Sequence, residues 1–313
     1  MGKRRKGYDT VPRIICAGLI AADLVYDVAA YPAKGTKTRA KASQMISGGG
    51  ALNAASAIAS LGGDVSIVGT IGDDELGAFL HKLMVARQID DQFLSKVSGA
   101  STSRSAILIT PDGERTIINH RDPILAPMKF TFPDGFLFDA ALVDTRWPEG
   151  AAQIANAARQ KGKPVIVDAE APVAKAEILL ECASHVVFSE QGLNDYCGGS
   201  DTAALKLAFK RLGNWCAVTR GANSVLCYDG NSLTEIPTLP TKAKNTLGAG
   251  DVWHGAFTLA LANQLSEPQA VQWANAAASL KVRRPIPDET LPTASEVAVL
   301  LDSGSIQSTE SVS

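Results

Sequence analysis

Residues 245–255, Asn-Thr-Leu-Gly-Ala-Gly-Asp-Val-Trp-His-Gly, place small residues and a carboxylate at the start of a predicted apolar helix. The first turn of a helix has unpaired N–H groups and the positive end of the helix dipole. Small residues, here Gly248, Ala249 and Gly250, let an anion approach those N–H groups. Asp251 beside that anion is placed to take a proton from an attacking hydroxyl. The segment therefore favours phosphoryl transfer to an alcohol, although an ordinary helix start with an Asp in its first turn looks the same.

The elements that must position this segment alternate between short apolar runs and helical patterns. Such alternation predicts parallel strands with helices on both faces of one central sheet. The predicted strands span residues 13–19, 64–70, 140–144, 164–168, 184–188, 215–219 and 223–228. The predicted helices span residues 50–61, 74–88, 148–161, 173–181, 201–212, 252–263 and 267–281. The expected fold class is therefore α/β with a mostly parallel sheet.

Two segments, residues 24–47 and 100–120, interrupt this alternation and are typical of extended chain with turns. Within the second segment, Pro111-Asp112-Gly113-Glu114 separates two apolar stretches and predicts a hairpin. We expect the two segments to form a small β-sheet of their own that projects from the main domain.

The two ends of the chain differ in composition from the middle. Residues 1–12 are basic and residues 303–313 are polar, so both are predicted to be disordered tails around one domain at 13–302. The basic run followed by residues 14–22 is similar to a short signal peptide, but we interpret the apolar run as a first buried strand. No run of 18 apolar residues occurs, so no membrane span is predicted.

The bulk composition excludes several classes of protein. The chain has 313 residues, of which 46% are hydrophobic and 20% charged, as in an ordinary globular protein. Its formal net charge of −2 gives no basis for binding nucleic acid or a membrane surface. The five cysteines and four histidines lack paired metal-ligand spacing. This predicts reduced cysteines in a cytoplasmic protein, and no zinc site.

Two motifs closely resemble the signatures of the ribokinase-like (PfkB) carbohydrate kinases. Residues 245–251 are similar to the second signature of that family. The first signature resembles Gly48-Gly49-Gly50-Ala51-Leu52-Asn53-Ala54-Ala55, continuing through residues 61–63 and 68–74. The motifs lie far apart in the chain and in the family order. The resemblance implies a ribokinase-like fold, a β lid over the sugar built from the two interrupting segments, and ATP and Mg²⁺ as cofactors.

Candidate sugar-binding residues lie in the first signature and after the first strand. From the residues alone, the three glycines before the helix indicate either a tight entry turn or close approach of a ligand. The resemblance implies that Gly48, Gly49 and Asn53 face sugar hydroxyls. Asp23 follows the first strand, where ligands bind in open α/β sheets, although a solvated turn Asp is the alternative. The resemblance assigns Asp23 to sugar hydroxyls as well.

Candidate nucleotide-binding residues come from the second half of the chain. The resemblance implies that Thr219 and Gly221, which flank Arg220 after a predicted strand, lie near the nucleotide phosphates and ribose. Asn275 is a further nucleotide candidate, with an ordinary helix-face Asn as the alternative. Ser189 stands where the family has the Asn of an Asn-x-x-Glu motif, and we assign it to the cofactor site.

Two departures from the family concern cations. The Asn-x-x-Glu motif, linked in the family to magnesium and phosphate, is replaced here by Ser189-Glu190-Gln191-Gly192. The metal-ligating side chains therefore stay open, and we expect magnesium to be held mainly by nucleotide phosphates and water. The family also has a glycine-containing loop associated with adenine and a monovalent cation. Residues 283–287 are short and lack glycine, so a monovalent cation is left open too.

Three residues of the predicted lid and its surroundings bear on the choice of sugar. Lys37, Asn119 and Arg146 occupy places that could converge on the far end of a sugar, although each also has a plain interpretation as a solvated or loop residue. The motifs around 105–107, 113–119, 144–147 and 188–193 resemble the sulfofructose kinase branch and, in part, ketohexokinase. In that branch a Lys, an Asn and an Arg at the matching positions bind the sulfonate, and a guanidinium and an ammonium suit a compact anion.

We interpret the chain as an ATP-dependent sugar kinase in which Asp251 is the base. The expected acceptor is the C1 hydroxyl of a ketohexose with an anionic C6 group, with 6-deoxy-6-sulfofructose the leading candidate. The alternatives are ketohexokinase, fructokinase or another furanose or nucleoside kinase, and a sugar- or nucleotide-binding regulator without catalysis. The expected partners are a sugar and a nucleotide, with neither nucleic acid nor membrane, and a second copy bound through the lid edges as a homodimer.

Overall fold

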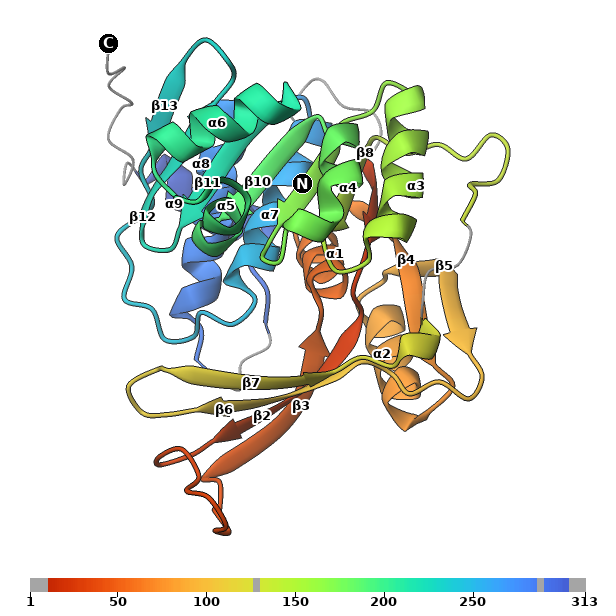
Figure 1. Ribbon diagram of the computed structural model, residues 1–313, viewed down its shortest axis with the longest axis vertical. Helices are drawn as coiled ribbons and strands as arrows, with labels where there is room; N and C mark the ends of the chain where they lie inside the picture. Colours follow the sequence, from red (N-terminus) through yellow and green to blue (C-terminus); the bar gives the residue numbers. More distant parts are fainter. Residues whose placement is uncertain (1–10, 126–129, 286–289, 304–313) are drawn as a thin grey trace, which may run out of the picture.

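The computed structural model describes residues 11–125, 130–285 and 290–303 (Figure 1). The two tails that were predicted to be disordered lie outside the described residues, apart from residues 11, 12 and 303. A large α/β body and a small separate sheet make up the described chain.

Within the described residues, the central sheet has nine strands in the order β13-β12-β11-β10-β9-β8-β1-β4-β5. Its strands are β1 (Arg13–Ala17), β4 (Asp64–Gly72), β5 (Asp90–Val97), β8 (Ala140–Asp144), β9 (Val165–Ala169), β10 (His185–Ser189), β11 (Trp215–Arg220), β12 (Asn223–Tyr228) and β13 (Leu233–Ile236). All neighbours from β11 to β5 pair parallel, whereas β12 and β13 pair antiparallel at one edge. The mostly parallel sheet predicted from the sequence is confirmed.

Helices cover both faces of this sheet and form two apolar cores. One face packs against α1 (Gly50–Ser60), α2 (Glu75–Ala86), α7 (Ala249–Ala262), α8 (Glu267–Arg283) and α9 (Ala294–Asp302). The other face packs against α3 (Pro148–Gln160), α4 (Glu177–Cys182), α5 (Glu190–Cys197) and α6 (Thr202–Leu212). The central strands are apolar on both sides, because each face must be buried under helices. Among the described residues, no helix combines the length and apolar character needed to cross a membrane.

A second sheet, which we call the small sheet, is built from the two segments that interrupt the alternation, although the first extends from Ala21 to Gly48 and so beyond the predicted 24–47. Its strands are β2 (Ala21–Asp27), β3 (Ala42–Gly48), β6 (Arg104–Ile109) and β7 (Arg115–His120), in the order β3-β2-β6-β7. Figure 1 shows it along one end of the α/β body, with the β6–β7 hairpin running beneath α7. The hairpin turns at residues 110–114, where Gly113 N–H donates to Thr110 O at 2.9 Å, as the Pro-Asp-Gly sequence predicted.

Two strands and two α-helices among the described residues were not predicted from the sequence, and α7 begins three residues earlier than predicted. The missed strands, β5 and β13, lie at the two edges of the central sheet, where polar residues break the apolar run. The missed α5 begins directly at the end of β10, without a loop to mark the boundary, and α9 is a short helix near the end of the chain. The helix predicted at 173–181 is a 3₁₀ turn at Ala174–Ala176 followed by α4.

Candidate active site

A cavity of about 390 Å³ lies where the carboxyl ends of the parallel strands face the small sheet. The ends of β8, β9, β10 and β11 and the starts of α1 and α7 contribute residues from the body. Strands β2, β6 and β7 contribute residues from the small sheet. The carboxyl edge of an open α/β sheet is where ligands bind, so the cavity is the candidate active site.

The start of α7 forms one wall of this cavity. Gly248 caps the helix with a left-handed backbone (φ 71°), a conformation that favours glycine. A side chain at Gly250 would meet no protein atom within 4 Å, so this position leaves open space beside the helix start. The Ala249 N–H donates to Thr246 O at 3.2 Å and is already in use. Of the three amides predicted to bind an anion, those of Gly248 and Gly250 are therefore the stronger candidates.

Asp251 lies in the first turn of α7 and lines the cavity. Its Oδ2 accepts a hydrogen bond from Asn53 Nδ2 at 2.8 Å, which joins the two signature motifs. Burial raises the pKa of Asp251 to about 7, and the nearby Asp168 adds to the rise, whereas the bond from Asn53 lowers it. A carboxyl group with a pKa near neutrality is suited to general base catalysis at physiological pH.

Asp168 and His254 surround Asp251 and were not singled out from the sequence. The Asp168 carboxyl lies on β9, and burial followed by the neighbouring Glu170 raises its pKa well above the usual range. His254 Nδ1 lies 2.8 Å from Gly250 O, and its Nε2 lies 3.5 Å from Asp168 Oδ1. Burial lowers the pKa of His254, which favours a neutral ring. The shifted pKa values favour the neutral forms of both Asp168 and His254, which lie next to Asp251.

Asp23 lies on β2 in the small sheet and lines the cavity as predicted for a sugar-binding residue. It is buried, and this burial raises its pKa, whereas a hydrogen bond from Ser105 opposes the rise. In the sheet register Asp23 pairs with Ser105, and Ser105 pairs with Asn119. This row of three polar residues crosses the small sheet and faces the cavity.

The glycines of the first motif are required by close packing. A Cβ at Gly48 would lie 2.3 Å from the Asp23 carboxyl carbon, and a Cβ at Gly49 would lie 2.2 Å from Leu19 O. Gly49 and Gly50 line the cavity, whereas Gly48 does not and instead packs behind Asp23. Gly48 therefore acts on the cavity by making room for Asp23.

Asp144 ends β8 and organises the loops beside the cavity. This buried carboxylate accepts from Leu19 N–H at 2.8 Å and from Arg146 N–H at 2.9 Å. A Cβ at Gly18 would lie 2.2 Å from the Asp144 carboxyl group, so the absence of a side chain at Gly18 leaves room for this carboxylate. The sequence analysis did not propose Asp144 as a site residue. The rule that identified Asp23, a carboxylate at the carboxyl end of a strand, would have found both Asp144 and Asp168.

Of the three residues predicted to bind an anion, Asn119 and Arg146 line the cavity. Arg146 Nη1 donates to Ala171 O at 2.6 Å, and its Nη2 forms an ion pair with Glu170. The guanidinium is therefore held in place from one side by protein acceptors. Lys37 is exposed in the loop between β2 and β3 and does not line the cavity, so the structure does not bring it to the other two.

Three further arginines line the cavity that the sequence analysis did not identify: Arg104, Arg115 and Arg121. Burial and the neighbouring Arg146 lower the pKa of Arg121, whereas Asp144 and Glu170 oppose this shift. Arg115 Nη1 donates to Thr246 Oγ1 at 3.2 Å, which ties β7 to the loop before α7. These residues follow or lie within strands of the small sheet, where nothing in the local sequence marks them as convergent.

The predicted nucleotide-binding residues separate into two groups. Ser189 is the last residue of β10 and Thr219 the second-last of the adjacent β11; the two pair with each other in the register and line the cavity. Gly221 lies in the turn between β11 and β12 (φ 59°) and does not line it. Asn275 is buried, accepts from Trp253 Nε1 at 2.7 Å and donates to Pro237 O at 3.0 Å. Its hydrogen bonds favour a structural role, since both ends of the amide are used within the protein.

The donor set bears on how a divalent cation would be held. Among the described residues, no group of three or more His, Cys, Asp or Glu side chains is arranged to hold a metal ion. Magnesium binds through a few carboxylates together with substrate phosphates and water more often than in an all-protein cage. Magnesium held mainly by nucleotide phosphates and water therefore stays a prediction.

Comparison with known proteins supports the same class. The model of the pfkB family carbohydrate kinases matches residues 11–294. Ribokinase of Bacillus subtilis is 25% identical over 295 residues, covering 92% of this chain and 99% of the relative. The crystal structure of a ribokinase-like protein from Agrobacterium tumefaciens has a TM-score of 0.89 at 32% identity, covering 94% and 98% of the two chains. Arabidopsis thaliana ribokinase, solved with ribose and ATP, shares the fold at a TM-score of 0.80 and 23% identity, covering 93% and 99%.

The chain therefore belongs to the pfkB family of carbohydrate kinases, and it is an ATP-dependent carbohydrate kinase. The predicted ribokinase-like fold is confirmed by the solved structures. The narrower resemblance to the sulfofructose kinase branch and to ketohexokinase is not shown, because the similar proteins above carry the name ribokinase.

Proposed function

We propose that this chain transfers the γ-phosphoryl group of ATP to a hydroxyl of a sugar bound against the small sheet. The observation that carries the proposal is the placement of Asp251, a base with a pKa of about 7, at the start of α7 within a cavity that Asp23 also lines. Asp251 takes the proton from the attacking hydroxyl. The free amides at the start of α7 stabilise the charge on the transferring group.

The nucleotide is proposed to lie along the part of the cavity formed by the ends of β10 and β11. Ser189 and Thr219 line this part and offer hydroxyls to phosphate oxygens. Gly221 and Asn275 do not line the cavity, so we propose that they support the fold around the nucleotide and do not contact it. Magnesium, when bound with the nucleotide, neutralises charge on its phosphates. The side chains that this chain itself supplies orient the phosphates and keep the acceptor hydroxyl beside Asp251.

The acceptor is proposed to be a ketohexose with an anionic group at C6, with 6-deoxy-6-sulfofructose the leading candidate and C1 the phosphorylated position. The support is electrostatic. Arg121 and Arg146 line one region of the cavity, and Arg146 is close enough to lower the pKa of Arg121. Asn119 lies on the adjoining strand β7 and offers an amide donor. Two neighbouring guanidiniums repel each other unless an anion joins them, and a sulfonate or phosphate supplies one.

A second candidate is a kinase for a neutral furanose such as ribose. The similarity to the ribokinase of Bacillus subtilis favours it, as does the hold that Glu170 and Ala171 already have on Arg146. In this case the two acidic neighbours, Asp144 and Glu170, neutralise the arginines and the sugar is bound by Asp23 and Asn119 alone.

We also propose that the protein is a homodimer through the small sheet. Strands β3 and β7 are the edges of that sheet, and the exposed apolar side chains Met45, Ile117 and Ile118 lie on them. Sedimentation velocity of the wild type and of an Ile118→Lys variant tests this. A dimer that becomes monomeric in the variant is expected, and a wild-type monomer at micromolar concentration contradicts it.

The test of the function is an ATP-consumption assay over a panel of sugars that includes 6-deoxy-6-sulfofructose, fructose 6-phosphate, fructose and ribose. We expect phosphorylation of at least one sugar and the highest kcat/KM for an anionic ketohexose. A preference for a neutral sugar removes the anionic-substrate proposal and leaves the kinase. Absence of turnover with every sugar, in the presence of Mg²⁺ and K⁺, supports the alternative of a regulator that binds without catalysis.

A further inference from the structure

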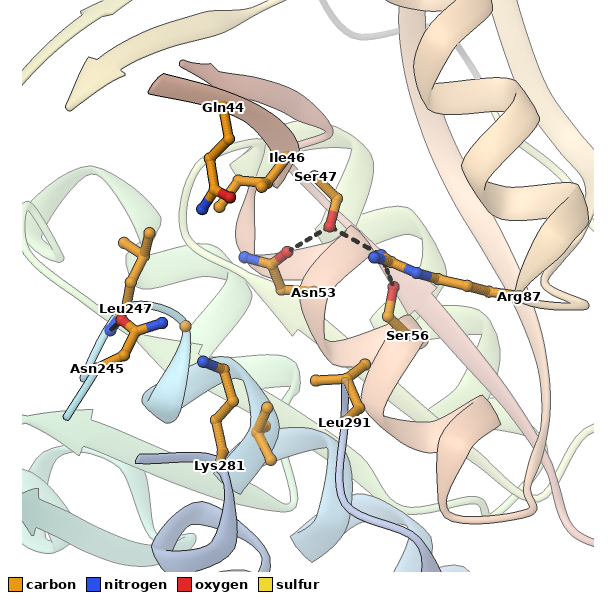
Figure 2. A pocket seen from close by; sticks show the side chains of 12 residues that line it. Gln44, Ile46, Ser47, Asn53, Ser56, Arg87, Asn245, Leu247, Lys281 and Leu291 are labelled. Carbon is orange, nitrogen blue, oxygen red and sulfur yellow. Dashed lines mark hydrogen bonds between the residues drawn. The ribbon is translucent and has the colours of Figure 1, made fainter. Parts of the chain in front are cut away.

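A chain of hydrogen bonds connects the catalytic base to an arginine outside the active-site cavity. Arg87 follows the end of α2 and reaches a second, smaller cavity of about 60 Å³ (Figure 2). Asn53 lines both cavities and so lies between them. Figure 2 shows the guanidinium of Arg87 directed toward Ser47 on β3 and Ser56 on α1, with Asn53 beyond Ser47.

The distances define a continuous path from Arg87 to Asp251. Arg87 Nη1 donates to Ser47 Oγ at 2.8 Å, and Ser47 Oγ donates to Asn53 Oδ1 at 3.3 Å. Asn53 Nδ2 then donates to Asp251 Oδ2 at 2.8 Å. The path connects four elements, since Arg87 caps the end of α2, Ser47 is on β3, Asn53 on α1 and Asp251 on α7.

The direction of every bond in this path follows from its two ends. An arginine has donors and no acceptor, so Ser47 must accept from Arg87 and is left with its single proton to give. The Asn53 side-chain oxygen accepts this hydrogen bond from Ser47, so the amide nitrogen is left to donate to Asp251. The ionised carboxylate at the other end only accepts, so it requires the same orientation. Arg87, which does not contact Asp251 in this path, thus favours one of the two orientations of the Asn53 amide over the other.

We propose that Arg87 is a positioning residue that, through Ser47, holds Asn53 with its amide nitrogen on Asp251. This inference rests on the proposed role of Asp251 as the base. When the relay is intact, the hydrogen bond from Asn53 stabilises the ionised carboxylate, which is the form that accepts a proton. When it is broken, Asn53 can turn, and a larger fraction of Asp251 carries a proton at neutral pH.

Other charged groups also act on Asp251 and must stay constant in a test. Asp168 and Glu170, from β9 and the loop after it, raise the pKa of Asp251, and His254 on α7 lowers it. Asp144 at the end of β8 lies near Gly50, as Asp251 does. Arg115 on β7 lines the same cavity as Asp251, and Lys281 on α8 lines the smaller cavity together with Gly248. Replacing Arg87 itself removes a positive charge, so a neutral change within the relay is the cleaner test.

Ser47 and Ser56 provide a matched pair for that test. Both hydroxyls accept from the same Arg87 Nη1, at 2.8 and 3.0 Å. The Ser56 hydroxyl donates a hydrogen bond to Leu52 O at 2.7 Å within α1, and so lies outside the path to Asp251. Ser47→Ala breaks the relay, whereas Ser56→Ala removes a bond of the same type and leaves the relay in place.

The experiment measures kcat against pH from 5.5 to 9.5 for the wild type, Ser47→Ala, Ser56→Ala, Arg87→Met and the double variant Arg87→Met/Ser47→Ala. For Ser47→Ala we expect the acidic limb to move up by about 0.5–1 pH unit, the size of one hydrogen bond. At pH 6 this lowers kcat about three- to tenfold, while kcat at pH 9 is nearly unchanged. Ser56→Ala should keep the wild-type profile, and the double variant should shift no further than Arg87→Met.

Two results overturn the inference. One is an unshifted profile for Ser47→Ala, and the other is an equal shift for Ser56→Ala, which would indicate a general loosening of α1. If Arg87→Met does not fold, the serine pair still decides. Asp251→Asn, measured in parallel, separates the two levels of the proposal. Loss of turnover in Asp251→Asn with no shift in Ser47→Ala rejects the relay and keeps the base, whereas an active Asp251→Asn rejects the base itself.

Discussion

The start of α7 and the small sheet form opposite walls of one cavity, and they are built in different ways. The α7 wall is a single local segment of backbone and small side chains, with Asp251 as its only ionisable member in residues 246–251. The wall of the small sheet consists of polar and charged side chains from strands far apart in the chain, with Asp23, Asn119 and Arg104 among them. The α7 wall thus carries the proposed phosphoryl-transfer chemistry, and the wall of the small sheet carries the residues proposed to select the sugar.

This comparison predicts different consequences for changes on the two walls. A change at the start of α7 should affect every substrate alike, since it acts on the phosphoryl group. A change in the small sheet or beside it should alter the ratio between substrates and leave the chemistry intact.

The largest effect is expected at the base. Asp251→Asn should lower kcat by at least ~10²-fold for all sugars, with little change in sugar affinity, because the proton acceptor is lost and the binding groups remain. Steady-state kinetics combined with calorimetric measurement of sugar binding checks both parts. Asp27→Asn, an exposed carboxylate on β2, is the control and should behave as the wild type. Near-normal turnover of the Asp251 variant would remove the mechanism proposed for this wall.

The next effect is expected from the opposite wall. If an anion joins Arg121 and Arg146, Arg146→Ala should lower kcat/KM for an anionic ketohexose on the order of 10–100-fold and change the value for plain fructose little. The measurement is the ratio of the two kcat/KM values in the wild type and the variant. Lys37→Ala, which changes an exposed residue outside the cavity, should leave the ratio unchanged. An equal loss for both sugars would mean that Arg146, through Glu170, is structural.

A smaller effect is expected in the motion of the two walls relative to each other. Arg115 on β7 donates to Thr246 beside α7, so a sugar held between them should strengthen this contact and slow amide exchange in β6 and β7. Hydrogen exchange with and without saturating sugar should show a slowing of roughly tenfold in these strands and little change in α7. Identical exchange in both states would argue against a lid.

The smallest effect concerns stability. The folded-state pKa of Asp251 is about 7, above the usual value for an unfolded Asp, so between these two values the folded protein retains a proton that the unfolded chain has lost. Stability from this group therefore falls as the pH rises toward 7, and the cost is complete above 7. Asp251→Asn has no such cost. Its melting temperature relative to the wild type should increase from pH 5 to pH 8, and a constant difference would contradict the raised pKa.

The α/β body and the α7 wall could be predicted from the sequence because both depend on local sequence patterns. The buried strands are continuous apolar runs, and the segment at 245–251 contains its helix cap, its open space and its base in consecutive positions. Edge strands β5 and β13 escaped because half-exposed strands need no apolar run. The small sheet was predicted as an element, but the residues that it brings to the cavity depend on register.

The convergence of long side chains was the least predictable feature. Arg121 and Arg146 meet because β7 and β8 deliver their ends to the same place, a fact of tertiary structure. Lys37 was predicted to converge with Asn119 and Arg146, and the structure places it in an exposed loop. Asn275 has a side-chain amide of the kind that often binds ligands, but this amide accepts a hydrogen bond from Trp253 and donates one to Pro237 O. No local pattern distinguishes such an internal amide from one that faces a ligand.

The parallel pairing of β2 with β6 also constrains the order in which the chain can fold. Ala22 pairs with Arg104, and the whole segment from β3 to β5 lies between them in the sequence. A parallel pair needs a crossover, and contacts so distant in sequence carry a large entropic cost until the intervening elements have formed. We therefore expect the small sheet to assemble late, after α1 and β4 have docked. A newly synthesised chain would then acquire its phosphoryl-transfer wall and its sugar-binding wall at separate times, which pulse-labelled hydrogen exchange during refolding can resolve.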